Sequence, residues 1–380
     1  MTICADDDWL APIARLGLTD PHVVIAMSGG VDSSVAALRV RAAGLRCSAL
    51  FMKNWNEPST DGSCAWEADV SDCLRVCDKL DIALNTVDLS QAYWDQVFAD
   101  FLAEYRRGRT PNPDVLCNRE IKFKAFLERA RARGGDLIAT GHYARNRWRD
   151  DAWQLLRGAD PNKDQSYFLY TLGQEQLATA LFPVGGSSKR AVRAAARGAG
   201  LATHDKQDST GICFIGERRF REFLGRYVPA APGPIETLDG TVIGTHHGAV
   251  YYTLGQRQGL GIGGVRGAAE LPWFVARKDL ARNALIVVQG TTHPALYARR
   301  LFAHDVVWVR GQAPALSTRL QARTRHRQAV QACVVDAHGA AGVAVEFERA
   351  QRAVTPGQSV VFYAGQVCLG GGIIDATAVA

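Results

Sequence analysis

A short apolar segment that ends at a pair of glycines limits the folds open to this chain. Residues 23–27, VVIAM, are apolar and stop at Ser28-Gly29-Gly30, and a helix is predicted directly afterwards. Strands that alternate with helices of 10–15 residues indicate an α/β fold with a doubly wound parallel sheet. The predicted strands are 23–27, 46–52, 82–88 and 136–140, and the predicted helices are 33–43, 65–80, 91–107, 118–133 and 188–199.

The pattern changes after about residue 222. Glycines become dense between Gly255 and Gly267, and short strands are predicted at 273–276 and 284–288. From about residue 298, short strands recur between turn signals such as DAHGAAG, which favours a small all-β barrel. We therefore expect three domains, which are residues 1–222 with an N-terminal extension at 1–21, a small central β-rich domain at 223–297, and a C-terminal β-barrel at 298–380.

Composition excludes several classes of protein. Of the 380 residues, 47% are hydrophobic and 22% are charged, a mix that excludes wholesale disorder. No apolar run approaches the roughly 20 residues of a membrane-spanning helix, and the acidic start lacks the features of a secretory signal. Nine cysteines without such a signal predict reduced thiols and a cytoplasmic protein. With no CxxC pair, the usual zinc and iron–sulfur ligands are missing, so we expect no protein-held metal site of that kind.

Basic residues are clustered on a chain whose formal net charge is +6. Residues 276–330 contain ten Lys or Arg and two acidic residues, and 104–133 and 186–226 each contain nine basic and four acidic residues. Such clusters favour a polyanionic partner, with solvated helix faces as the alternative. Because side chains alternate along a strand, a strand over 317–328 would form a cationic ridge on one face. The ridge residues are Arg319, Arg323, Arg325 and Arg327.

The segment from Ser28 to Ser34, SGGVDSS, lies where a phosphate-binding loop is expected, between a strand and a helix. Two glycines let the backbone approach an anion, and amides at the helix start point toward it. No Gly-Lys-Ser/Thr follows, so this is not the Walker loop. The motif resembles the PP-loop of ATP pyrophosphatases, which cleave ATP between the α- and β-phosphates. A serine-capped glycine turn without a ligand is the alternative.

Two cysteines lie in predicted loops. Cys117 follows Pro111-Asn112-Pro113-Asp114, and Cys213 lies among polar residues and glycines. If Asn118 caps the following helix, Cys117 precedes a helix N-terminus, where the dipole lowers a thiol pKa. Asp114 is close enough to exchange a proton there, although an inert buried Cys117 is the alternative. Two loop thiols in a nucleotide-binding protein suggest sulfur chemistry, in which one carries a persulfide and the other attacks it.

Long motifs in a fixed order carry a more specific resemblance. They include LFMKNW (50–55), GRTPNPDVLCN (108–118), ATGHY (139–143), NKDQSYFLYTL (162–172), DSTGICFIGERRFREFLGRY (208–227) and TPGQSVVFY (355–363). From about residue 22 to the C-terminus, the chain resembles the bacterial tRNA-specific 2-thiouridylase family, within the PP-loop or HUP-type superfamily. The resemblance implies a tRNA-uridine 2-sulfurtransferase, which replaces the C2 oxygen of a wobble uridine with sulfur and releases AMP and pyrophosphate.

The resemblance also implies cofactors, partners and residue roles. ATP with Mg²⁺ would bind the loop, with Asp32 as a magnesium ligand or an orienting group. Cys117 would be the nucleophile and Cys213 the persulfide carrier, with a transient Cys117–Cys213 disulfide and Asp114 beside them. The ATP site would comprise Ala26, Met27, Ser28, Gly29, Gly30, Val31, Asp32, Ser33, Met52 and Gly141. The tRNA contacts would be Asn112, Pro113, Asp114, Lys163, Asp164, Gln165, Arg325 and His326, where His326 replaces a family tyrosine.

Further implied features are a central domain that binds tRNA, tRNAs for Lys, Glu and Gln as substrates, and sulfur-relay proteins fed by a cysteine desulfurase. The protein is expected to be monomeric. Adenylation of the C2 oxygen makes it a good leaving group, after which either Cys213 persulfide attacks C2 directly or Cys117 first releases hydrosulfide.

Two other classes of protein remain open. A small-molecule PP-loop ligase of the argininosuccinate- or GMP-synthetase type needs neither cysteine, and a non-catalytic RNA-binding adaptor does not need the ATP loop.

Overall fold

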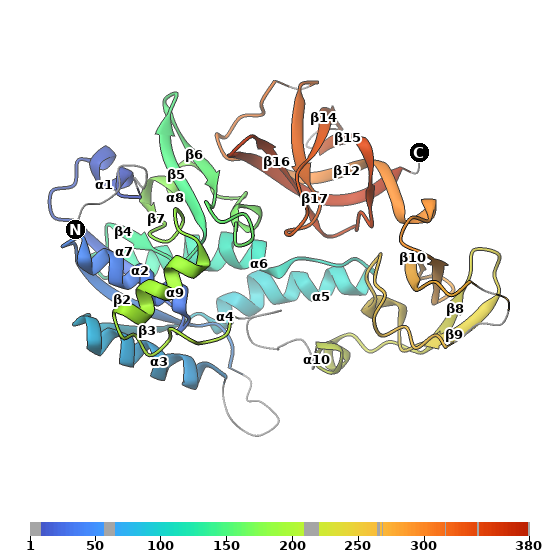
Figure 1. The fold of residues 1–380 in the computed structure, drawn as a ribbon, viewed down its shortest axis with the longest axis horizontal. Helices are drawn as coiled ribbons and strands as arrows, with labels where there is room; N and C mark the ends of the chain where they lie inside the picture. The colour runs from blue at the N-terminus through green and yellow to red at the C-terminus, as the bar shows by residue number, and fades with distance from the viewer. Residues whose placement is uncertain are drawn as a thin grey trace.

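The computed structural model describes residues 9–56, 65–208, 220–263, 267, 269–315, 317–339 and 342–378. Cys213, the expected persulfide carrier, lies outside these residues. The described part contains a parallel sheet, a small mixed sheet and a barrel, which Figure 1 shows as an elongated arrangement with the parallel sheet at one end. No helix in these ranges combines the length and the apolar character needed to cross a membrane.

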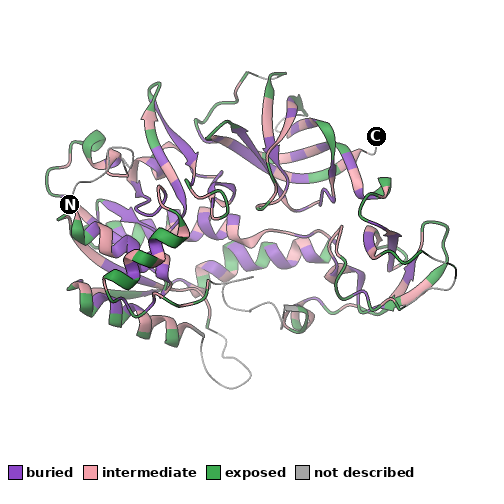
Figure 2. Ribbon diagram, viewed as in Figure 1, coloured by how far each residue is buried: buried purple, intermediate pink, exposed green. Residues whose placement is uncertain are grey.

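The N-terminal part is the expected doubly wound parallel sheet, in the order β3-β2-β1-β4-β7. Along β1, Val24 and Ala26 face one hydrophobic core, while Val23 and Ile25 face another on the opposite side. Figure 2 shows this central layer as largely buried. The strands are β1 (His22–Met27), β2 (Arg46–Lys53), β3 (Leu84–Asp88), β4 (Leu137–Ala139) and β7 (Ala180–Leu181).

Helices cover both faces of this sheet. One face carries α2 (Val31–Ala42), α3 (Ala65–Leu80) and α9 (Lys189–Gly198), which form one core with it. The other face carries two long helices, each interrupted by a π-helical stretch, a feature often found at functional sites. The first consists of α4 (Ser90–Tyr93), η1 (Trp94–Phe98) and α5 (Ala99–Arg106), and the second of α6 (Pro113–Leu116), η2 (Cys117–Ala125) and α7 (Phe126–Arg131). Shorter helices are α1 (Ala11–Leu16), η3 (Ser166–Phe168) and α8 (Gln174–Thr179).

The remainder of the chain forms the expected central β-rich part and C-terminal barrel. The central sheet has the order β10-β11-β8-β9, and the barrel closes because β12 pairs with both β15 and β17. The central elements are α10 (Phe220–Tyr227), β8 (Gly233–Glu236), β9 (Val242–His246), η5 (Ala249–Tyr251), β10 (Trp273–Asp279), β11 (Ala284–Gln289) and η6 (Pro294–Leu296). The barrel strands are β12 (Tyr297–Trp308), β13 (Arg319–Arg323), β14 (Gln331–His338), β15 (Gly342–Arg352), β16 (Ser359–Ala364) and β17 (Val367–Ala378).

A hairpin from the N-terminal part extends the barrel sheet, which the sequence analysis did not predict. Strands β5 (Ala144–Arg149) and β6 (Ala152–Arg157) follow β4, and β6 pairs with β17. The barrel is therefore joined to the N-terminal part by backbone hydrogen bonds as well as by side chains.

A buried ion-pair group lies beside this join. The carboxylate of Asp164, fully buried, accepts hydrogen bonds from Arg323 of β13 at 3.0 Å and from Arg157 of β6 at 3.2 Å. It also accepts hydrogen bonds from the backbone N–H groups of Gly158 and Ser166. Because every one of these donors is directional, the group fixes how the barrel sits on the N-terminal part.

The expected arginine ridge is wrong. Strand β13 ends at Arg323, and residues 324–328 form bends and turns, so the alternation on which the ridge depends stops. Arg323 is buried against Asp164, and the Arg325 guanidinium donates to the backbone oxygens of Leu254 and Ala353. Arg319 and Arg327 are the exposed members.

We predict that Asp164→Asn lowers the free energy of unfolding by about 3–5 kcal/mol, because it leaves the buried Arg323 charge without its anion. The matched control is Glu348→Gln, which removes the exposed partner of Arg319 and should cost about 0–1 kcal/mol. Urea unfolding monitored by fluorescence measures both. Equal small effects would show that the buried group does not hold the two parts together.

Candidate active site at the edge of the parallel sheet

The candidate site lies at the carboxyl ends of β1 and β4. These neighbouring strands are the point at which the strand order reverses, where the chain turns to opposite faces of the sheet. In open α/β sheets, ligands bind in the crevice at this position. The segment from Ser28 to Ser33 follows β1, and Gly141 follows β4, so the fold brings both predicted parts of the ATP site together.

The backbone of the loop is tightly packed. Gly29 has a φ of +72°, and a Cβ at this position would lie 2.6 Å from the backbone oxygen of Asp69. A Cβ on Gly141 would lie 2.6 Å from the backbone nitrogen of Ser33. The Ser33 hydroxyl donates to the Gly30 oxygen at 3.0 Å and lies 3.1 Å from the Ser28 hydroxyl. Both glycines are therefore required by close backbone approach.

The start of α2 is suited to an anion. Gly30 is the N-cap residue, and among the described residues no side chain caps this helix, so its first amides remain for a ligand. Of the other predicted ATP-site residues, Ala26, Met27 and Val31 are buried around the loop. Met52 lies at the end of β2, one residue beyond the partner of Met27.

Charged side chains surround the loop. The Asp32 carboxylate accepts hydrogen bonds from the Tyr143 hydroxyl at 2.7 Å and from Lys189 Nζ at 2.8 Å. Lys189 also pairs with Asp208, which accepts further hydrogen bonds from Lys163 and Arg193. Burial would raise the pKa of Asp208, but the hydrogen bonds from Lys163 and Lys189 lower it to about 2. Sequence reasoning missed Lys189, because it lies 157 positions from Asp32 and no local pattern marks it.

The position of Cys117 corrects the sequence prediction. Asn112, and not Asn118, is the N-cap residue, and its side-chain oxygen accepts from the Asp114 N–H at 3.2 Å. Cys117 lies one turn inside the helix, at the start of the π-helical stretch, and is buried. Pro113 occupies the first helical position, where its missing N–H leaves no hydrogen bond unmade. This explains why the helix begins before the predicted residue 118.

Asp114 has an unusual environment. Burial raises the pKa of its carboxyl group, and the neighbouring Lys122 and His326 oppose this effect. His326 comes from the barrel and lies 2.8 Å from the backbone oxygen of Asp164 through its Nε2 atom. Its ring centroid is 4.3 Å from that of Phe168. The barrel thus contributes a side chain to the surroundings of Asp114.

The segment from Lys163 to Gln165 lies beside the phosphate loop. Lys163 pairs with Asp208, and the Gln165 side chain accepts from the Tyr143 N–H at 2.9 Å. The Asp164 side chain is fully buried, and the half-buried Arg325 donates hydrogen bonds to the backbone oxygens of Leu254 and Ala353. Both side chains therefore make contacts within the described part of the molecule, and their contact with tRNA stays a prediction.

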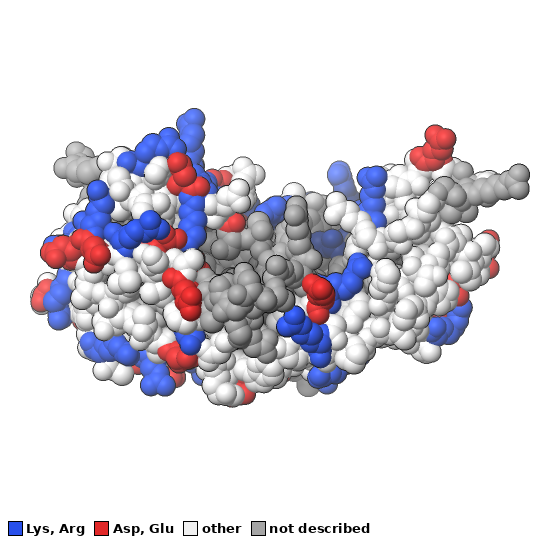
Figure 3. Space-filling view, turned by 90° about the horizontal axis from the view of Figure 1, so that it is seen from below, with Lys and Arg blue, Asp and Glu red and all other residues white. Residues whose placement is uncertain are grey.

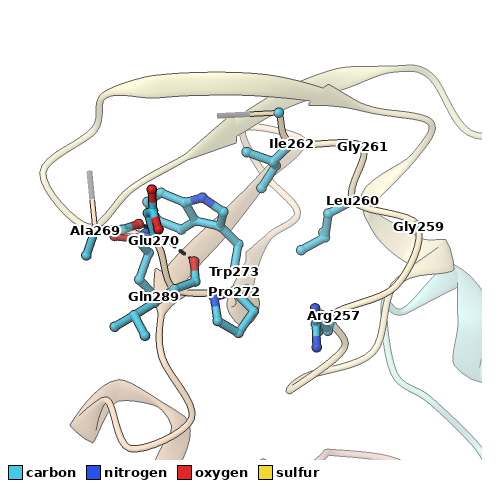
Figure 4. Close-up of a pocket in the computed structure, with 12 residues that line it drawn as sticks. Arg257, Gly259, Leu260, Gly261, Ile262, Ala269, Glu270, Pro272, Trp273 and Gln289 are labelled. Atoms are coloured by element: carbon cyan, nitrogen blue, oxygen red, sulfur yellow. Dashed lines mark hydrogen bonds between the residues drawn. The ribbon is translucent and has the colours of Figure 1, made fainter. Parts of the chain in front are cut away.

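A cavity of about 490 Å³ lies elsewhere, in the central part. Figure 4 shows the Trp273 indole on one side of it, and on the other side Arg257 and the glycine-rich backbone segment that continues through Gly259 and Gly261. Figure 3 shows one face of the molecule, on which Lys and Arg side chains gather mainly over the N-terminal part, with acidic side chains among them.

The chain matches three family models in order. Residues 21–217 match the tRNA methyl transferase HUP domain, residues 221–289 the tRNA methyl transferase PRC-barrel domain, and residues 298–374 the aminomethyltransferase beta-barrel domain. With the phosphate loop at the sheet edge, these matches define an ATP-using protein of the HUP class.

The relatives narrow this class. The chain is 57% identical to the tRNA-specific 2-thiouridylase MnmA of Methylococcus capsulatus, over 94% of this chain and 97% of that protein. It is also 57% identical to the protein of the same name from Stutzerimonas stutzeri, over 93% of this chain and 94% of that one. The chain therefore belongs to the tRNA-specific 2-thiouridylase family of enzymes.

We predict that Gly141→Ala weakens ATP binding by about 5- to 150-fold, because overpacking against Ser33 costs about 1–3 kcal/mol. Gly198→Ala, at a position with open space around it, should leave the affinity unchanged. Isothermal titration of both variants with ATP checks this, and equal affinities would mean that the Gly141 contact does not shape the loop.

Proposed function

We propose that this chain is an ATP-dependent tRNA-uridine 2-sulfurtransferase, which converts the wobble uridine of tRNA to 2-thiouridine. One observation carries the proposal. A chain of contacts leads from the phosphate loop to His326: Asp32 is bonded to Tyr143, Tyr143 to Gln165, and the neighbouring Asp164 to His326. His326 in turn lies near Asp114, at the start of the Cys117 helix. These contacts support a single site that combines nucleotide chemistry with cysteine chemistry, a combination that a small-molecule PP-loop ligase does not need.

The first step activates the uridine. Its C2 oxygen attacks the α-phosphate of ATP, the bond to the β-phosphate breaks, and pyrophosphate leaves. The amides at the start of α2 bind the phosphates, and Lys189 lies beside this lysine-free loop in an ion pair with Asp32. Asp32 is the loop carboxylate that would hold Mg²⁺, which would supply charge neutralisation for the pyrophosphate.

The second step transfers sulfur. The terminal sulfur of a Cys213 persulfide attacks C2, and the C2–O bond breaks to release AMP. The Cys117 thiolate then attacks the Cys213 sulfur, so that a Cys117–Cys213 disulfide forms and the transferred sulfur remains on the uridine. In the alternative order, Cys117 attacks first and releases hydrosulfide, which attacks C2. Both orders end in the same disulfide, which a cellular thiol reductant must reduce.

Asp114 acts as the proton-exchanging group in this scheme. Its raised pKa keeps a proton available closer to neutral pH than for an exposed carboxyl group. Asn112 and Pro113 hold it at the helix start, where they also face the base. His326 lies beside it, and its imidazole ring can stack on a base in place of the tyrosine that the family resemblance implies.

The sequence resemblance supports the remaining assignments. The substrates are tRNAs for Lys, Glu and Gln, and relay proteins fed by a cysteine desulfurase supply the sulfur to a cytoplasmic, monomeric enzyme. Domains span residues 1–222, 223–297 and 298–380. In the central domain, Trp273 and Arg257 border the cavity of Figure 4 and offer the aromatic and guanidinium groups on which RNA bases stack.

Substitution of either cysteine tests the scheme. Cys117→Ser and Cys213→Ser should each abolish 2-thiouridine formation, because both thiols are consumed in every turnover, while ATP and tRNA binding remain. Cys47→Ser, at a half-buried thiol of β2, is the control and should retain activity. Mass spectrometry of digested tRNA gives the yield. Wild-type yield from either loop variant would rule out the two-cysteine mechanism.

A further inference from the structure

The segment that leads into the Cys117 helix is held by the other two parts of the molecule. It runs from Gly108 to Asn112, between α5 and α6, and passes alongside the barrel (Figure 1). At Gly108, whose φ is +71°, a Cβ would lie 2.2 Å from a methyl carbon of Leu280, in the turn between β10 and β11 of the central sheet. The start of the segment is thus packed against the central part.

The barrel holds the middle of the segment more firmly. The Thr110 N–H donates to the Pro356 oxygen at 3.0 Å, and the Gln358 side chain donates to the Thr110 oxygen at 2.7 Å. Both backbone polar groups of this buried residue are therefore bonded to one turn of the barrel, Thr355–Gln358. Gly357 has a φ of +91°, and a Cβ there would lie 3.0 Å from the Thr110 backbone.

The turn itself is fixed to the barrel. The Gly357 N–H donates to the Ile374 oxygen at 2.9 Å, and the Ile374 N–H donates to the Gln358 oxygen at 2.8 Å. Next to it, Arg109 forms an ion pair with Asp375 of the same strand, β17. The turn is consequently anchored on β17 and is held in a fixed position relative to the barrel.

The backbone between Thr110 and the reacting groups has little conformational freedom. Pro111 and Pro113 have fixed φ angles, and Asn112 between them is held by its cap hydrogen bond to Asp114. We propose that the Thr355–Gln358 turn is a positioning element for thiolation. By holding Thr110 in register, Gly357 and Gln358 set where Asp114 and Cys117 lie relative to the target uridine. This inference rests on the roles proposed above for those two residues.

The test compares two glycines of the same barrel. Gly357 and Gly365 both have positive φ, so Gly→Ala strains the backbone at each, but only at Gly357 does the new methyl group meet Thr110. A displacement of about 1 Å can cost about 10²-fold in rate. We expect Gly357→Ala to slow single-turnover thiolation by about 10- to 100-fold at saturating ATP and tRNA, and Gly365→Ala to stay within about twofold.

A second pair of variants, with smaller effects on folding, tests the inference if Gly357→Ala folds poorly. Gln358→Met removes only the donor to Thr110, and Gln331→Met removes a comparable side-chain donor on β14. The first should lower the maximal rate without changing the Kd for ATP or tRNA, and the second should change neither. The positioning role would be overturned if the two variants within each pair had equal thiolation rates, or if a variant lost only affinity for ATP or tRNA. Cys117→Ser is assayed alongside these variants. If Cys117→Ser is inactive while the Gly357 and Gln358 variants are as fast as their controls, the proposed function stands and only this inference fails.

Discussion

The Asp164 carboxylate is fully buried and accepts hydrogen bonds from Arg157 of the N-terminal hairpin and Arg323 of the barrel. Removing such charges from water costs several kcal/mol per ion, so the group persists only because nearly every lone pair is satisfied. The same contact fixes the angle between barrel and parallel sheet, and pairing of β6 with β17 continues it along the backbone. The site depends on this angle, because it places His326 near Asp114 and the Thr355–Gln358 turn against Thr110, in the segment before the Cys117 helix.

A second charged group lies at the opposite side of the site. Asp32 in the phosphate loop and Asp208 share Lys189, and Asp208 is the last described residue before the stretch that contains Cys213. The pKa of Asp208 is lowered to about 2 from an ordinary 3.8, so the stability it contributes is present above pH 3.8 and is lost as the pH falls toward 2. Throughout the physiological range this link between the nucleotide loop and the chain leading to Cys213 therefore remains charged.

The parts of this fold with short-range signals were predictable from the sequence. Apolar strands that alternate with helices gave the parallel sheet, and the glycines after β1 gave the phosphate loop. Long-range pairings were not predictable, since Lys189 meets Asp32 across 157 positions and β6 joins a barrel strand from the far end of the chain. The arginine ridge failed for a related reason, because the odd spacing of Arg323 and Arg325 has meaning only while the strand continues.

The most direct test of the whole account is the stoichiometry of ATP cleavage in a single turnover. With persulfide-loaded enzyme, AMP and pyrophosphate should form in equal amounts with 2-thiouridine when the tRNA carries a wobble uridine. Neither should form without tRNA or with a tRNA in which cytidine replaces that uridine. AMP formation that is independent of the wobble base would identify a small-molecule ligase, and tRNA binding without any ATP cleavage would identify an RNA adaptor. Either result would contradict the account.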